Sequence, residues 1–161
     1  MGRIASVVCA AALLAPAAAA ADEGATGIGV GAEAMLTGPT GASVVYDAAR
    51  FRVSGVLGFV DDGVDAVGIG ARFVWVMHRG DAADFGVGGG IGVVNEDAGG
   101  GMADDDRTNV HIELMGQLRA FLTRNVALSA SFGASAIAGD NDGFAFGGQL
   151  VGSLGAHYFF W

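Results

Sequence analysis

The chain has 161 residues and a formal net charge of −9, and its composition is 52% hydrophobic, with 29 glycines and two prolines. The acidic balance excludes a nucleic-acid-binding protein, which needs a basic surface, and the length suits one domain. Beyond residue 21, no stretch approaches the roughly 20 consecutive apolar residues of a membrane-spanning helix.

The first 21 residues have the pattern of a secretory signal peptide. Arg3 gives a basic start, residues 4–14 are apolar, and an alanine tract with an A-x-A cleavage site ends at Ala21. We expect residues 1–21 to be removed and residues 22–161 to form one exported domain. Cys9 is the single cysteine and lies in the removed segment, so we expect no disulfide in the mature domain.

The remaining chain alternates between apolar and small or polar residues. Alternation is the period of a strand, and a glycine at every second position would disfavour a helix by about 1 kcal/mol each. Eight such runs follow in chain order: Thr26–Leu36, Ala42–Asp47, Phe51–Val60, Val67–Met77, Phe85–Val94, Val110–Leu122, Val126–Ile137 and 144–161.

The sixth run fits two templates. As a strand, residues 110–122 place Ile112 and Leu114 on one face and Glu113 and Arg119 on the other; as a helix, they give an apolar stripe at spacings of three and four. The number of strands decides between them, because a seven-stranded antiparallel ring could not close. An open edge in lipid would leave backbone groups without partners, at several kcal/mol each.

The connections between the runs are of two kinds. Three are compact and each contains an arginine, at residues 47–50, 78–84 and 122–125. The four others are at residues 37–41, 61–65, 95–107 and 138–143, and the last three of these are acidic. Eight runs with connections of alternating kind predict an all-β fold, an eight-stranded antiparallel up-and-down transmembrane β-barrel.

In such a barrel we expect the apolar rows to face lipid and the opposite rows to fill the lumen, which at eight strands is about wide enough for side chains. The polar rows supply a predicted lumen charge network of Glu33, Arg52, Arg72, Glu113, Gln117 and Arg119. We expect these charges to pair, because an isolated buried charge is costly. We favour a salt-bridged structural plug over an ion path or proton relay, and we expect the many lumen glycines to make room for the arginines.

The chain ends with AHYFFW, an aromatic terminus after alternating apolar residues. With the predicted export peptide and the eight runs, this resembles the outer-membrane β-barrel domains of Gram-negative bacteria, of the opacity and OmpA types. The resemblance implies an outer-membrane location, acidic loops outside, lipid and lipopolysaccharide as surroundings, and insertion by the barrel-assembly machinery through Phe159 and Trp161. One departure is that Phe159 and His157 share the row of Trp161, whereas the apolar row holds Tyr158 and Phe160, so either a bulge shifts the register or the predicted faces fail there.

One loop also suggests a binding site. Acidic residues of the longest loop could hold divalent cations that bridge lipopolysaccharide phosphates, although a solvated acidic loop is the simpler interpretation. They are Glu96, Asp97, Asp104, Asp105 and Asp106. No catalytic arrangement of His78, His111 or His157 is evident, and we expect no enzyme activity, no cofactor and no structural metal.

The sequence thus predicts a monomeric outer-membrane barrel with a structural or surface-interaction role. Two alternatives stay open. One is a narrow porin-like channel for small solutes, and the other is a soluble periplasmic β-protein that uses the same apolar rows as its core.

Overall fold

The computed structural model describes residues 25–61, 65–97, 106–140, 143–146 and 152–160. These residues form nine β-strands, and none of them belongs to a helix long and apolar enough to cross a membrane. The strands are β1 (Gly27–Ala34), β2 (Thr40–Asp47), β3 (Phe51–Asp61), β4 (Asp65–Arg79), β5 (Ala83–Asp97), β6 (Asp106–Phe121), β7 (Val126–Gly139), β8 (Gly143–Phe146) and β9 (Ser153–Phe159).

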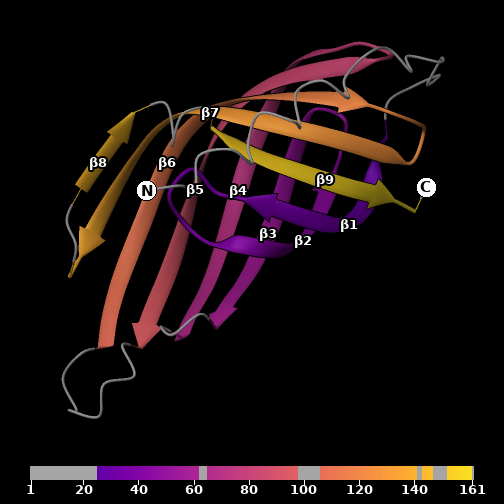
Figure 1. Cartoon of the computed structure of the whole chain (residues 1–161). Helices are drawn as coiled ribbons and strands as arrows, with labels where there is room; N and C mark the ends of the chain where they lie inside the picture. Colours follow the sequence, from indigo (N-terminus) through magenta and orange to yellow (C-terminus); the bar gives the residue numbers. More distant parts are fainter. Residues whose placement is uncertain (1–24, 62–64, 98–105, 141–142, 147–151, 161) are drawn as a thin grey trace, which may run out of the picture.

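The strands close into a ring of eight. Antiparallel neighbours run from β1 to β7, β9 pairs with both β7 and β1, and β8 adds to the far part of β7 (Figure 1). Among the described strands, closure leaves no long sheet edge, and this is how a barrel satisfies its backbone groups. The predicted eight-stranded antiparallel barrel is confirmed. The segment with two possible interpretations, Val110–Leu122, lies in strand β6 and not in a helix.

The eighth run is not one continuous strand. β8 pairs with Ala134–Ile137 of β7, whereas β9 pairs with Val126–Ser131, so the chain between them holds more residues than the partner strand offers. The registers of β8 and β9 against β7 differ by an even number of residues. Alternate side chains therefore keep the same inward or outward direction in both strands. Tyr158 and Phe160 point outward, while His157 and Phe159 are buried, so the predicted faces hold at the end of the chain.

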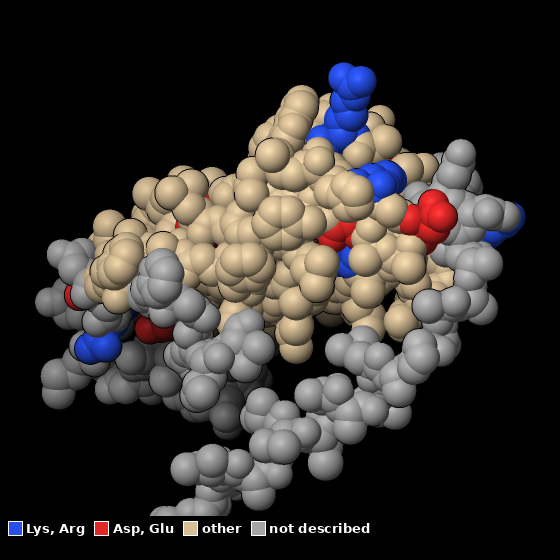
Figure 2. Space-filling view, turned by 90° about the horizontal axis from the view of Figure 1, so that it is seen from above, with Lys and Arg blue, Asp and Glu red and all other residues tan. Residues whose placement is uncertain are grey.

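The two faces of the wall have opposite chemistry. Outward positions carry large apolar side chains, such as Leu57, Phe59, Ile69 and Leu114, each more than half exposed. The interior holds most of the buried charged side chains together with valines, a methionine and phenylalanines from the same inward rows. The interior is thus less polar than the sequence pattern predicted. Figure 2 shows a face on which uncharged residues cover most of the described surface.

The wall has unequal height. β1 and β2 have 8 residues each, whereas β5 and β6 have 15 and 16 (Figure 1). The first run was predicted to continue to Leu36 with that side chain facing lipid, and this was wrong. β1 ends at Ala34, and Met35, Leu36 and Pro39 are buried inside the barrel. We call residues 35–39 the inturned segment.

Candidate functional site in the barrel interior

The central cluster consists of Arg72, Glu33 and Glu113. Arg72 comes from β4, Glu33 from β1 and Glu113 from β6, so three walls of the barrel meet at one guanidinium. Arg72 Nη1 donates to Glu33 Oε1 at 2.7 Å, its Nη2 donates to Glu113 Oε2 at 3.1 Å, and its Nε also donates to Glu113. Nη2 donates further to Ser153 Oγ at 3.0 Å. All three nitrogens are therefore used, as a buried guanidinium requires.

The turn-end cluster lies nearer the compact, arginine-bearing connections and contains five charged side chains: Asp47, Arg52, Arg79, Asp84 and Arg119. Asp84 accepts from Arg52 Nη1 at 2.9 Å and from Arg119 Nη2 at 2.7 Å. Asp47 pairs with Arg79 Nη2 at 2.7 Å and with Arg119 Nη2 at 2.5 Å. Two aspartates are thus shared among three arginines.

All six side chains of the predicted lumen network lie in the interior, but they divide between these clusters. Glu33, Arg72 and Glu113 are central, and Arg52 and Arg119 belong to the turn end. Gln117 lies between them, because its Nε2 donates to Ser131 Oγ at 3.2 Å and reaches Glu33 Oε1 at 3.5 Å.

Sequence reasoning missed Asp47 and Asp84, which are the anions of the turn-end cluster. Asp47 ends both the second predicted run and β2, whereas Asp84, which the prediction leaves in a connection, is the second residue of β5. Their positions continue the inward rows of Ser43 and Val45, and of Gly86 and Gly88. Continuing the alternation through Asp47, and by one residue back from Phe85, would have found them.

A histidine also joins the central region. His157 Nε2 lies 2.7 Å from Ser43 Oγ and 4.0 Å from Glu33 Oε2. A serine, a histidine and a carboxylate are therefore close together, but the serine and the carboxylate approach the same ring nitrogen. A catalytic triad needs the carboxylate on the other nitrogen, where it orients the base, so this geometry supports hydrogen bonding inside the barrel rather than nucleophilic catalysis.

The inturned segment lies directly on the central cluster. The backbone N–H of Leu36 donates to Glu113 Oε2 at 2.8 Å. Thr37 Oγ1 donates to Ser135 Oγ at 3.0 Å and lies 3.3 Å from His111 Nδ1. Within the segment, Met35 N–H donates to the carbonyl of Pro39 at 3.1 Å. The segment is therefore a tight turn held to β6 and β7 from inside.

Glycines of β4 and β5 make the space that this segment occupies. A Cβ at Gly92 would lie 2.7 Å from Pro39 Cδ, one at Gly68 would lie 2.7 Å from Pro39 Cβ, and one at Gly70 would meet the Met35 sulfur. Gly90 does the same for the central cluster, because its Cβ would lie 2.7 Å from Glu113 Oε1 and 3.0 Å from Arg72 Cγ. Interior glycine here provides volume for other side chains and for a turn.

The remaining predicted site residues are only partly described. Glu96 is half-buried near the end of β5, and Asp97 and Asp106 are cross-strand partners where β5 and β6 end. Asp104, Asp105 and Trp161 lie outside the described residues. Within the described part of the chain, no three histidine, cysteine or acidic residues group as a metal site. Phe159 is buried, and its ring lies 5.4 Å from the Arg119 guanidinium.

No protein-family model and no curated protein sequence matches the chain. Among solved structures, it is similar to the crystal structure of the N-terminal beta-barrel domain of Pseudomonas aeruginosa OprF, with a TM-score of 0.55 and 14% identity. The alignment covers 81% of this chain and 93% of that domain. At this identity the likeness is one of fold, and at that level it confirms the resemblance to eight-stranded outer-membrane barrels.

Proposed function

We propose that this protein is a small, monomeric outer-membrane barrel whose lumen is closed and whose role is structural or surface-interacting, without enzyme activity. The inverted distribution of side chains carries the proposal. Large apolar residues face outward on every wall while arginines and carboxylates are buried. In water, an apolar surface of that extent would associate or aggregate, whereas in hydrocarbon it is the stable arrangement.

The two ends of the barrel differ in charge, and this difference supports one orientation of the barrel in the outer membrane. Exposed Arg50 and Arg124 lie in the compact turns, and the strand ends that flank the acidic connections, such as Asp61, Asp65 and Asp106, lie at the opposite end. Short turns face the periplasm and longer loops face outward in barrels of this type, so the acidic loops, including residues 96–97 and 104–106, would meet lipopolysaccharide and its divalent cations. Insertion would use the barrel-assembly machinery, with residues 1–21 as the export signal.

Two layers of contacts support a closed lumen. The inturned segment fills one part with Met35, Leu36 and Pro39. The paired charges of the central and turn-end clusters occupy most of the rest, together with buried apolar side chains such as Val45 and Phe121. An eight-stranded barrel has an interior that side chains alone can fill. We therefore expect no steady conductance from the wild-type protein.

Membrane placement is tested by expression of the full chain in a Gram-negative host. We expect the protein in the outer-membrane fraction, with a heat-dependent mobility shift on a denaturing gel. A monomer that stays soluble in detergent-free buffer would contradict the proposal and favour a periplasmic β-protein.

Closure is tested in planar bilayers with the wild type, Glu113→Ala and Gly92→Val. The first variant removes the acceptor of the Leu36 N–H, and the second places a side chain where Pro39 lies. We expect rare or no openings in the wild type and frequent openings in both variants, with Gly55→Ala, at an outward position with free space, behaving like the wild type. A large steady wild-type current would instead support the porin-like channel.

A further inference from the structure

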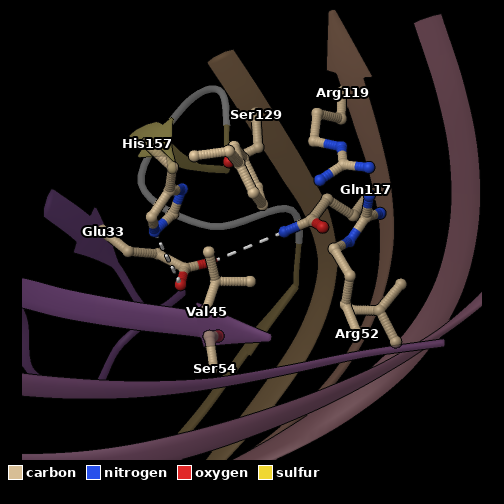
Figure 3. Close-up of a pocket in the computed structure, with 10 residues that line it drawn as sticks. Glu33, Val45, Arg52, Ser54, Gln117, Arg119, Ser129 and His157 are labelled. Carbon is tan, nitrogen blue, oxygen red and sulfur yellow. Dashed lines mark hydrogen bonds and ion pairs between the residues drawn. The ribbon is translucent and has the colours of Figure 1, made fainter. Parts of the chain in front are cut away.

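A small cavity lies between the central cluster and the turn-end cluster. Its volume is about 10 Å³, and Arg52, Arg119 and Gln117 lie on one side of it with Glu33 and His157 on the other (Figure 3). Ser129 and Ser54 also line it. The cavity therefore touches both clusters and lies in neither.

Several polar atoms of the residues that line it make no hydrogen bond to another protein group. Glu33 Oε2 accepts no hydrogen bond, and Arg52 Nε, Arg52 Nη2 and Arg119 Nη1 donate none. The exposed fractions of these residues are 3% for Glu33, 4% for Arg52 and 2% for Arg119, so all three are at least 96% buried. Buried polar groups of native proteins almost always have a partner, so this set points to a bound species.

The lining restricts the chemistry of that species. Guanidinium donors require an acceptor, and the Glu33 oxygen requires a donor. A halide would satisfy the arginines but meet the Glu33 carboxylate, and a metal cation would satisfy Glu33 but meet the arginines. A water molecule both donates and accepts, and roughly 10–15 Å³ is the smallest cavity that holds one.

We infer that the cavity is the binding site of one internal water molecule, which donates to Glu33 Oε2 and accepts from Arg52 or Arg119. This water joins the two clusters. The resulting network runs from the Leu36 N–H through Glu113, Arg72 and Glu33 to the water. From the water it continues to Arg119, which contacts both Asp84 and Asp47, and from Asp47 to Arg79. The inference depends on the interior alone, so it does not require membrane placement.

A high-resolution crystal structure of the wild-type protein tests the site, with a second crystal soaked in bromide. We expect one peak of density within hydrogen-bond distance of Glu33 Oε2 and of a nitrogen of Arg52 or Arg119. We expect no anomalous bromide signal there. An absent peak, or a bromide ion in its place, would overturn the inference.

A matched pair of variants tests whether this cavity is what holds the water. Val74 lines the cavity, whereas Val56 is an equally buried interior valine that does not. Val74→Ile should fill the cavity and abolish the peak, and Val56→Ile should retain it at full occupancy. A peak that persists unchanged in Val74→Ile, or that disappears only in Val56→Ile, would contradict the assignment, and the wild-type structure decides the matter if a variant does not fold.

Discussion

The central and turn-end clusters both bury arginine and carboxylate inside one barrel, but they distribute the partners differently. In the centre, one arginine serves two glutamates and all three of its nitrogens are used. At the turn end, three arginines serve two aspartates, and Arg52 and Arg119 keep unused donors. With every group ionised, the centre has one excess negative charge and the turn end one excess positive charge.

The difference indicates which residues each cluster depends on. Loss of Arg72 would leave two buried carboxylates with no cation in contact. Loss of any one turn-end arginine would leave both aspartates with at least one remaining partner. The clusters should therefore differ in sensitivity to single substitutions, because Arg72 takes part in both arginine–glutamate pairs of the centre, whereas the turn-end pairs are spread over three arginines.

The largest expected effect is that of Arg72→Met. Removing one partner of a buried ion pair costs about 3–5 kcal/mol, and here two acids lose their partner together. Urea unfolding of the protein refolded in lipid vesicles, followed by tryptophan fluorescence, measures the free energy of unfolding. A triple variant that also carries Glu33→Gln and Glu113→Gln should recover part of the loss, and a single variant as stable as the wild type would refute the dependence on Arg72.

Arg52→Met should have a smaller effect, of about 1.5–3 kcal/mol, the range for a hydrogen bond to a charged group. Asp84 keeps Arg119, and Asp47 keeps Arg79 and Arg119. The same unfolding measurement applies. If this variant loses as much stability as Arg72→Met, then the sharing of partners at the turn end gives no tolerance.

Thr37→Val tests the contact between the inturned segment and the wall beside the central cluster. The variant keeps the volume and removes the hydroxyl that donates to Ser135, so we expect a loss of about 0.5–1.5 kcal/mol. Bilayer recordings should at the same time show more frequent openings than in the wild type. An unchanged open probability would mean that the Leu36 N–H bond to Glu113 is sufficient to hold the segment.

Arg79→Ala should have the smallest effect, of about 0–1 kcal/mol, since this is the partly exposed member of the turn-end cluster, with its side chain 21% exposed. Water can replace its contact with Asp47, and Arg119 remains. The loss should shrink further when the salt concentration is raised. A salt-independent loss above about 2 kcal/mol would place Arg79 among the structurally required residues, against this ranking.

The sequence was sufficient for the architecture and for the direction of many side chains. Alternation has period two, so once the face of Phe73 is assigned to the outside, Arg72 and Val74 must point inward. The same rule places Glu113 and Arg119. Closure into eight strands followed from counting, because the physics of an open edge excludes seven.

The sequence was not sufficient to predict which charged residues pair with each other or where the strands end. Which carboxylate meets Arg72 depends on the registers of six strands, which no local pattern specifies. Leu36 was placed outside because the run of apolar residues continues through it, whereas the chain turns inward after Ala34 into space left by Gly68, Gly70 and Gly92. That space is created by strands far away in the sequence.

For the orientation proposed above, the unequal wall affects which molecules reach the barrel interior from the cell surface. At about 3.4 Å per residue, β5 and β6 are close to twice as long as β1 and β2, so the rim is oblique and the inturned segment lies on its low side. A large molecule such as an antibody or a protease would contact the long β5–β6 hairpin first. This contact would keep it away from residues Met35–Pro39. Only small molecules, or an approach from the low side, would arrive at that turn.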